Sequence, residues 1–374
     1  MDWLSILWFI LIAVLWVGYL ILEGFDLGVG ALLPFVAKND EERTQTVKTI
    51  GPHWDGNEVW LLTAGGATFA AFPEWYATMF SGMYLALFLV LVLLILRIAA
   101  IEWRKTVDTV RWRSTWDTIH TVVGFGVPIL FGVAFANLVQ GMKIEVVDPI
   151  TMEPVAGPIT DEVLAHSVHN ITGGFFSLLT VFTVLGGLVV LALSMSQGAQ
   201  FLSLKTTGPV HDRAERLSSI LSLAAAVLTA VWAIWAVLAY ANTVWAWLPL
   251  VVAAVALIGS AAFAQKAMNN SMLSFILSSV GIAGAVAFIF TAMAPNVMKS
   301  SIDDAFSLTI AQASSTHPTL VVMTIAAIIF VPIVLAYTAW SYWVFRSRVT
   351  PGDVPQAMGL LPKRIREGAN FLQG

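Results

Sequence analysis

Long apolar segments recur along most of the chain, and short polar stretches separate them. A membrane-spanning helix needs about 20 apolar residues, because the hydrocarbon core of a bilayer is about 30 Å thick. Segments of this length predict about nine helices, of which the second is the shortest. Their approximate bounds are 4–34, 57–73, 78–101, 118–141, 168–195, 217–241, 244–265, 271–294 and 318–345.

Most connections are short, which favours one membrane domain of antiparallel neighbouring helices. A stretch around 142–167 contains Pro149, Pro154 and Pro158, and we expect it to be a turn-rich linker that divides the chain after the fourth helix. The pattern therefore predicts two four-helix bundles and one further helix. The expected parts are a domain over 1–345, with helices one to four in about 1–141, helices five to eight in about 168–294 and helix nine in about 318–345, and a cytoplasmic tail over 346–374.

The basic residues predict the orientation, because cytoplasmic loops of membrane proteins are rich in Lys and Arg. With the N-terminus outside, the outer loops hold Lys143 and Lys299, and Arg97 lies within the third helix. All other basic residues fall on the inner side, so nine helices with N-out and C-in fit the pattern. These inner residues are Lys38, Arg43, Lys48, Arg104, Lys105, Arg111, Arg113, Lys205, Arg213, Arg216, Lys266, Arg346, Arg348, Lys363, Arg364 and Arg366.

Composition agrees with a membrane protein and excludes several other classes. The 374 residues are 58% hydrophobic and 11% charged, whereas soluble domains are about a quarter charged. The first segment is too long for the apolar core of a cleavable signal and lacks a charged start, so we expect it to be retained. The chain has no cysteine, which excludes disulfides and thiolate-held zinc or iron–sulfur clusters. No basic stripe with interleaved aromatics indicates nucleic-acid binding.

Several of the 15 tryptophans lie near predicted helix ends, where we expect them to anchor the helices at the membrane interface. Trp54 and Trp60 differ, because they flank charged residues. The expected anchors are Trp3, Trp75, Trp103, Trp116, Trp245 and Trp247.

Five charged residues lie in or beside the first three segments. Glu23 and Asp26 share one face of the first helix, and Asp55 and Glu58 repeat the same spacing at the start of the second. Arg97 lies within the third. A charge at the bilayer centre costs on the order of 3 kcal/mol, so these groups must face protein or water. We therefore expect them to find one another.

The predicted topology places all five charges in the cytoplasmic half of the membrane. Four acids against one arginine leave unpaired carboxylates, so we expect at least one of them to hold a proton and to be able to pass protons. A purely structural alternative is that Arg97 neutralises Asp26 or Asp55 and so locks three helices together. The spacing Gly24-x-x-x-Gly28 is mainly a helix-packing signal.

None of the histidines makes a convincing haem or metal ligand, although membrane haem proteins use histidine as an axial ligand. His120 lies inside the fourth helix without an evident partner, and His166 and His169 stand near the outer surface. The sequence thus predicts no cofactor-binding residue and no metal site in this chain.

Two motifs resemble subunit II of the cytochrome bd quinol oxidases. The first is Glu23-Gly-Phe-Asp-Leu-Gly-Val-Gly, and the second runs from Gly51-Pro-His-Trp-Asp-Gly-Asn-Glu-Val-Trp to Phe72-Pro. Further similar blocks are Glu102-Trp-Arg, Gly132-Val-Ala-Phe-Ala-Asn-Leu and Tyr337-Thr-Ala-Trp-Ser-Tyr-Trp, so the resemblance covers nearly the whole chain.

The resemblance implies a nine-helix subunit that pairs pseudosymmetrically with subunit I in the bacterial plasma membrane. Such a complex oxidises quinol, reduces O₂ to water and takes protons from the cytoplasm without pumping them. Two b-type haems and one d-type haem then lie in subunit I, and this chain ligates none. The family also leaves room for a structural quinone, bound membrane lipid and a small single-helix accessory subunit.

The resemblance also implies roles for individual residues. Familiar members often carry Asp and Gln where this chain has Glu23 and Glu58, so the role of Glu58 does not follow from the family directly. The implied roles are a proton path through Asp55, Glu58 and Glu23, support of the haem region by Asp26, Arg97 and Trp54, and oxygen access at Trp60.

Two other functions compete with this prediction. Buried carboxylates also mark proton-coupled secondary transporters, but those place charges in corresponding positions of two repeats, and here they occupy only the first three helices. The other alternative is a purely structural partner subunit without a role in proton transfer.

Overall fold

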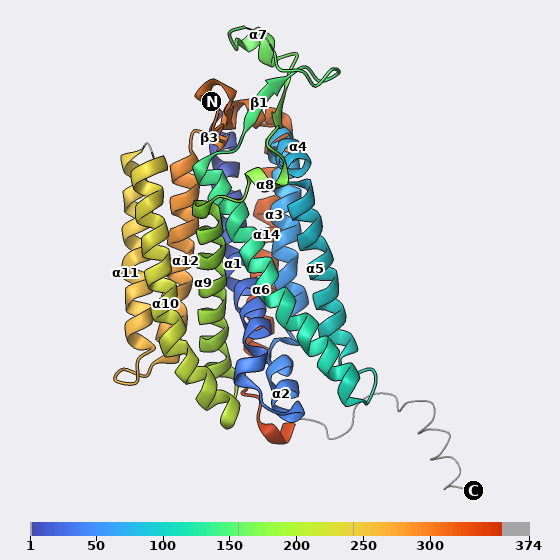
Figure 1. Ribbon diagram of the computed structural model, residues 1–374, viewed down its shortest axis with the longest axis vertical. Helices are drawn as coiled ribbons and strands as arrows, with labels where there is room; N and C mark the ends of the chain where they lie inside the picture. Colours follow the sequence, from blue (N-terminus) through green and yellow to red (C-terminus); the bar gives the residue numbers. More distant parts are fainter. Residues whose placement is uncertain (1, 156, 242, 354–374) are drawn as a thin grey trace, which may run out of the picture.

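The computed structural model describes residues 2–155, 157–241 and 243–353, which form mostly helices that run along one axis (Figure 1). Eight helices in these ranges are long and apolar enough to cross a membrane, so the chain is an all-α integral membrane protein. They are α1 (Trp3–Val36), α5 (Tyr84–Trp103), α6 (Val110–Gln140), α9 (Val181–Lys205), α10 (Pro209–Tyr240), the stretch Val244–Phe263 with α11 (Trp247–Phe263), α12 (Ser271–Met293) and α14 (His317–Val344).

The second expected helix is α3 (Trp54–Ala71), which packs against α1 but is not among these eight. Its first turns carry Asp55, Asn57 and Glu58, which make it too polar to qualify by composition. The count of nine therefore stays a prediction, with α3 as the ninth helix.

A break at Phe72 separates the second expected helix from the third, and the third expected helix is itself interrupted at Met83. Phe72 leaves the helical conformation at φ −137° and ψ 70°, since the residue before a proline is driven out of the α region. Pro73 then begins α4 (Pro73–Gly82), and α5 starts only after Met83. The predicted segment 78–101 is thus two helices.

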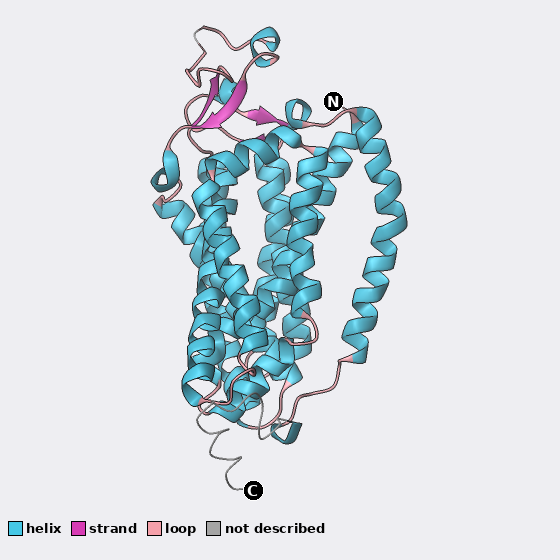
Figure 2. Cartoon of the chain, turned by 90° about the vertical axis from the view of Figure 1, so that its right-hand side faces the viewer, coloured by secondary structure: helices cyan, strands magenta, loops and turns pink. Residues whose placement is uncertain are grey.

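The helices form two groups, as the sequence predicts. Helices α1, α3, α5 and α6 lie on one side and α9 to α12 on the other, and α1 and α6 both pack against α9 (Figure 1). Helix α14 stands at the edge, as Figure 2 shows, and Leu320 is its buried residue. It is therefore the peripheral helix.

Glycines set the close approach of α1 and α9. A Cβ atom on Gly28 would lie 1.9 Å from the carbonyl oxygen of Ser194, and one on Gly198 would lie 2.5 Å from the carbonyl carbon of Gly28. Gly24 is less crowded, because its nearest neighbour would be Gln197 Oε1 at 3.6 Å. The packing role predicted for the Gly24-x-x-x-Gly28 spacing is confirmed, and Gly28 carries most of it.

At the end of the bundle that holds the N-terminus, the expected turn-rich linker carries a pair of strands at its two ends, and its prolines lie in the turns and loop between them. Strand β1 (Ile144–Val147) pairs antiparallel with β2 (Val168–Ile171), with Ile144 opposite Ile171. The prediction of a helix from residue 168 is therefore wrong, because these residues bond to β1. Helix α9 begins at Val181 behind a Thr180 capping box and extends to Lys205.

Short elements complete this end of the molecule. A second pair of strands is antiparallel with a bulge in its register. The elements are α7 (Asp161–Leu164), α8 (Gly174–Ser177), β3 (Asn296–Met298), β4 (Leu308–Thr309) and α13 (Ile310–Ala313).

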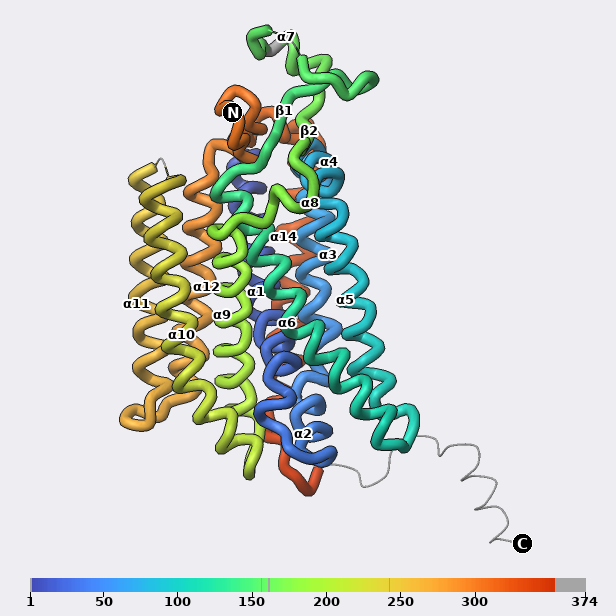
Figure 3. The backbone as a smooth tube through the Cα atoms, in the orientation of Figure 1, coloured from blue at the N-terminus to red at the C-terminus, as the bar shows by residue number. Residues whose placement is uncertain are grey.

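The opposite end collects the basic loops. Helix α2 (Asp40–Ile50), the turns that follow α5 and α9, and the short helix η3 (Pro351–Asp353) all lie there, as the trace in Figure 3 shows. Gln45 Nε2 donates to the carbonyl of Val349 at 2.8 Å, so the beginning of the expected tail is attached to α2. The rest of that tail, 354–374, lies outside the described residues. N-out and C-in stays a prediction.

The tryptophans divide into two kinds. Trp3 and Trp245 are exposed, as anchors should be. Trp75 is only 2% exposed and packs near Phe9, Phe72 and Phe290, so its prediction as an interfacial anchor is wrong.

Candidate functional site

The buried charges of the first three expected helices form one ion cluster around Arg97. Its guanidinium group makes an ion pair with Glu23, and Nη1 also lies 3.4 Å from Glu58 Oε2. Nη2 lies 3.7 Å from Asp26 Oδ2. Glu23, Asp26 and Arg97 are each 0% exposed. The cluster thus joins α1, α3 and α5, and we name these four residues the Arg97 cluster.

The helix geometry explains why the cluster forms. Glu23 and Asp26 lie one turn apart on α1, so both reach the same neighbour. Glu23 follows the start of α1 by about 30 Å at 1.5 Å per residue, which is about the thickness of the hydrocarbon core. Because Asp2 begins α1 at the end with the N-terminus, the cluster lies near the far boundary of the membrane.

The cluster carries more acid than base. Three carboxyl groups face one guanidinium group, and among the described residues no donor other than Arg97 reaches either carboxylate oxygen of Glu23. Uncompensated buried charge is costly, so a proton bound to one carboxyl group would relieve that cost. The arrangement can therefore hold and release protons.

Asn57 is a residue that the sequence analysis did not single out. Its Nδ2 donates to Asp26 Oδ2 at 2.8 Å and to the carbonyl of Leu22 at 3.2 Å. Its Oδ1 accepts a hydrogen bond from the hydroxyl of Tyr342 at 2.8 Å. Asn57 therefore connects the cluster to α14, and its place in the Trp-Asp-Gly-Asn block was the available signal.

Two further polar side chains lie next to this region. His53 is 4% exposed and stacks on Tyr342 with ring centroids 4.2 Å apart. Tyr19, one turn before Glu23 on α1, is buried, and its hydroxyl has no hydrogen-bond partner among the described residues. Neither was predicted as part of the site.

Asp55 does not join the cluster. It lies in the first turn of α3, is exposed, and makes no ion pair or hydrogen bond within the described part of the chain. The expectation that all five charges find one another is therefore wrong for Asp55. The structural alternative also changes, since Arg97 pairs with Glu23 and Glu58 as well as Asp26 and not with Asp55.

The two tryptophans beside the charges are half-buried. Trp54 packs against an apolar group that includes Phe25 and Leu32. Trp60 lies against α1, where a Cβ atom on Gly18 would come within 2.1 Å of its ring. Both side chains therefore help to hold α3 on α1.

His120 is buried on α6 where this helix packs against α1. Its ring lies against Gly30, whose Cβ position would be 2.8 Å from His120 Cδ2. Its Nε2 has no hydrogen-bond partner among the described residues. The ring fills the space that Gly30 leaves, which is a packing role.

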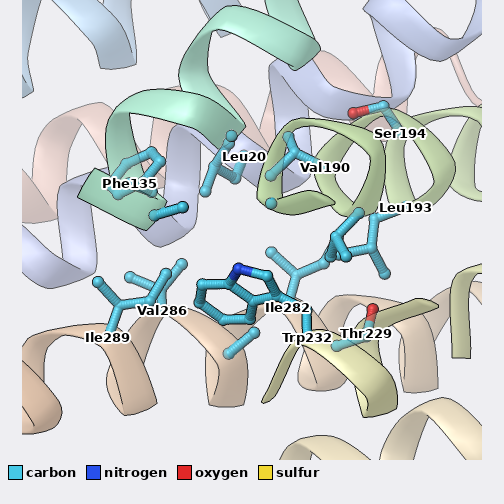
Figure 4. Close-up of a pocket in the computed structure, with 15 residues that line it drawn as sticks. Leu20, Phe135, Val190, Leu193, Ser194, Thr229, Trp232, Ile282, Val286 and Ile289 are labelled. Carbon is cyan, nitrogen blue, oxygen red and sulfur yellow. The ribbon is translucent and has the colours of Figure 1, made fainter. Parts of the chain in front are cut away.

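A small apolar cavity of about 50 Å³ lies between the two helix groups. Figure 4 shows the Trp232 indole in the middle of its lining, with Leu20, Phe135 and Val286 around it. Ordinary ligand pockets measure about 300 Å³ or more, so a quinone ring or a haem does not fit here.

Neither of two cavities in the described part of the chain offers an axial ligand for a haem, and no cluster of metal ligands is seen there. No three His, Asp or Glu side chains gather in a metal-binding arrangement within 2–155, 157–241 and 243–353. The Trp232 cavity is lined by neither histidine nor methionine, and the same holds for a larger cleft at the basic end of the bundle. No chemical step is therefore assigned to a cofactor held by this chain.

The fold and the site define a multi-pass membrane subunit with a buried, acid-rich ion cluster. The model of the family "Cytochrome bd terminal oxidase subunit II" matches residues 4–345. The chain belongs to this family. It is therefore an oxidoreductase subunit of a respiratory terminal oxidase in the bacterial plasma membrane. This excludes the alternative that the chain is a secondary transporter.

Individual relatives agree over nearly the full length. The chain is similar to cytochrome bd ubiquinol oxidase subunit 2 of Bacillus subtilis, with 38% identity over 92% of this chain and 96% of the relative. It is 35% identical to cytochrome bd-I ubiquinol oxidase subunit 2 of Escherichia coli K12, over 94% of this chain and 96% of the relative.

A solved structure shares the fold. A chain of the bd oxidase from Geobacillus thermodenitrificans superimposes with a TM-score of 0.72 at 14% identity, over 92% of this chain and 99% of that chain. At this identity the likeness concerns the arrangement of the helices alone.

Proposed function

We propose that this chain is the subunit of a quinol oxidase that ligates no haem and supplies a route for protons taken from the cytoplasm. The relatives in Bacillus subtilis and Escherichia coli are ubiquinol oxidase subunits by name. In the complete complex, quinol is oxidised and O₂ is reduced to water at two b-type haems and one d-type haem, all held by subunit I. This chain is then scaffold and proton route.

The observation that carries the proposal is the graded burial of three carboxyl groups. Asp55 is exposed, the Glu58 side chain is 15% exposed, and Glu23 is fully buried. Asp55 and Glu58 lie one turn apart on α3, where i and i+3 side chains are neighbours. The series leads from the surface at the basic end of the bundle to the interior.

Arg97 links the last two members of this series, because Nη1 faces both Glu58 and Glu23. Its fixed positive charge stabilises whichever carboxylate has released its proton. A proton that reaches Glu58 from Asp55 can therefore be exchanged within the cluster without leaving an unbalanced buried charge. Water completes the steps between groups that are not in contact.

The remaining predicted residues hold this route in place. Asp26, through its hydrogen bond from Asn57, and Trp54 fix α1 and α3 against each other, and with Arg97 they support the haem region of the partner from this side. Trp60 is half-buried on α3. On the same helix, no atom lies within 4 Å of the Cβ positions of Gly65 and Gly66. This open apolar surface suits the entry of O₂, an apolar molecule.

The face of α3 that carries Asp55 also suits the docking of subunit I. Gly66 lies about three turns after Asp55 on this face and has open space at its Cβ position, and small residues let helices of two subunits approach closely. Docking at this face would enclose Asp55 and Glu58 between the subunits, which turns an exposed carboxylate into the entrance of a channel.

The test is oxygen consumption by the complete complex carrying Asp55→Asn, at saturating quinol and normalised to the d-type haem absorption. We expect turnover to fall by about tenfold or more, since about 1.4 kcal/mol of added barrier gives that factor. The control is Glu41→Gln, an exposed carboxylate in the first turn of α2, which should leave the rate unchanged. Undiminished turnover in assembled Asp55→Asn rejects the proton route.

A further inference from the structure

A cleft of about 580 Å³ opens at the basic end of the bundle, outside the proton route proposed above. It lies between α2, the ends of α5 and α9, and the segment that follows α14, which passes below α2 in Figure 3. Its volume falls within the range of about 300–1,000 Å³ that is usual for ligand sites. The basic residues that line it are Lys48, Arg104, Lys105, Arg113 and Lys205.

One wall of the cleft is electrically balanced, because three arginines face three aspartates when Arg43, whose Nη1 lies 3.5 Å from Asp117 Oδ2, is included. Arg104 Nε donates to Asp117 Oδ1 at 2.6 Å, and its Nη2 donates to Asp40 Oδ1 at 2.9 Å. Arg113 pairs with Asp40 at 2.9 Å and also with Asp108. This network is rigid, because Arg104 is only 5% exposed, and it fixes the shape of the cleft.

The other wall carries two lysines that form no close ion pair with another described residue. Lys48 Nζ donates to the carbonyl of Asp353 at 2.7 Å, and Lys205 Nζ donates to the carbonyls of Phe345 and Ser347. Neither ammonium group lies within 4.0 Å of a carboxylate oxygen in the described ranges. A carbonyl hydrogen bond positions an ammonium group without neutralising it. Two positive charges therefore face the cleft.

Aromatic residues indicate where the cleft lies relative to the membrane. Glu102 and Arg104 line it, and Trp103 lies between them in the chain. The Trp103 ring meets Trp116 with centroids 5.5 Å apart, and Trp116 meets Trp112 at 5.6 Å. Tryptophans gather at the membrane interface, at the level of the lipid headgroups. The charged cleft thus lies where lipid phosphates are.

We propose that this cleft is a binding site for a phosphate-bearing anion, held by Lys48 and Lys205 against the rigid Arg104 wall. Basic pockets between membrane helices recognise acidic lipid headgroups through the same chemistry. The phosphate can belong to an acidic phospholipid or to a small soluble phosphate compound, and both place the same group between the two lysines.

The experiment uses the complete complex, purified in a non-ionic detergent and depleted of lipid. Phosphatidylglycerol, phosphatidylcholine and inorganic phosphate are added separately, and lipid retention by native mass spectrometry and the midpoint of thermal unfolding are recorded. We expect phosphatidylglycerol to bind and to raise the midpoint. A rise with inorganic phosphate alone would assign the site to a soluble phosphate. Equal binding of phosphatidylcholine, or no binding of either anion, overturns the proposal.

Variants locate the binding. The double variant Lys48→Gln with Lys205→Gln should weaken binding of the anion at least tenfold, and the control Lys266→Gln, an exposed lysine at the same end of the bundle, should not. Lys48 and Lys205 also hold the segment after α14, so the glutamine variant changes structure as well as charge. The double variant Lys48→Arg with Lys205→Arg keeps both positive charges, and we expect it to bind the anion. Native affinity in the double glutamine variant would overturn the assignment.

Discussion

Asn57 Nδ2 donates a hydrogen bond to Asp26 Oδ2 across 2.8 Å, between two side chains that are almost completely buried. Through the hydroxyl of Tyr342, which bonds to Asn57 Oδ1 at 2.8 Å, the same amide connects a membrane-embedded carboxyl group to the peripheral helix α14. The Asn57 side chain thus joins α1, α3 and α14 at the edge of the Arg97 cluster.

This relationship predicts the effect of Asn57→Ala. The variant leaves Asp26 without a donor and should lower the free energy of unfolding by about 1.5–3 kcal/mol, as for other hydrogen bonds to charged groups. Thermal unfolding of the complex measures it. Tyr342→Phe is the matched comparison, because it removes one neutral hydrogen bond and should cost about 0.5–1.5 kcal/mol. Equal losses in the two variants would contradict the account of Asp26.

Arg97→Ala tests the support of the haem region. The substitution leaves buried carboxyl groups without their counter-charge, and removing one partner of a buried pair costs about 3–5 kcal/mol. We expect the purified complex to lose bound haem through failed packing, as read from its absorption spectrum. Arg111→Ala, at an exposed position, should retain haem. A normal haem spectrum in Arg97→Ala would refute the supporting role.

Two glycines one turn apart on α1 make a matched pair for the packing account. Gly28→Ala places a methyl group 1.9 Å from the carbonyl oxygen of Ser194, and overpacking of this kind costs about 1–3 kcal/mol. Gly24→Ala meets its nearest neighbour at 3.6 Å and should be tolerated. Yield and thermal stability of the two complexes compare them directly, and similar behaviour would mean that α1 and α9 can separate freely.

Acid should loosen the basic end of the bundle through Glu42. Burial opposes ionisation there, but hydrogen bonds from the Lys38 backbone N–H and the Arg213 guanidinium outweigh it and lower the pKa of Glu42 below its ordinary value of 4.5. A lowered pKa stabilises the fold above that value, and the contribution disappears as pH falls through the folded-state pKa.

Glu42→Gln isolates this contribution. The variant should be less stable than the native complex at pH 7, and the difference in unfolding midpoint should shrink as the pH falls below 4.5 and through the lowered pKa of Glu42, where the native carboxyl group also takes up a proton. A difference that stays constant between these pH values would show that the carboxylate contributes no pH-dependent stability.

Much of the fold follows from the lengths of the apolar segments, and the errors have identifiable causes. The segment 168–195 looks continuous by hydropathy, yet Val168–Ile171 pairs with a strand more than 20 residues earlier in the chain. The position of Trp75 near a helix end suggested an interface, but its burial depends on Phe9 and Phe290 from distant helices. Long-range contacts of this kind leave no local pattern.

In the candidate site, too, local spacing predicts some contacts, and others depend on residues far apart in the chain. Spacing alone placed Glu23 and Asp26 on one face of α1, and both contact Arg97. The contact between Tyr342 and Asn57 joins residues 285 positions apart, which no helical period reveals. By residue type and spacing, Asp55 seemed as able as Glu58 to contact Arg97. In the structure the Asp55 side chain, in the first turn of α3, is exposed and does not contact Arg97.

The central claim is that Asp55 and Glu58 belong to one proton route. Its most direct test is the turnover of the assembled complex carrying Asp55→Asn, Glu58→Gln and both together, each normalised to haem content. If the two carboxyl groups act in series, the double variant should be no slower than the slower single variant, because the effects of coupled residues are not additive. Rates that multiply in the double variant, or a native rate in Glu58→Gln, would contradict the claim.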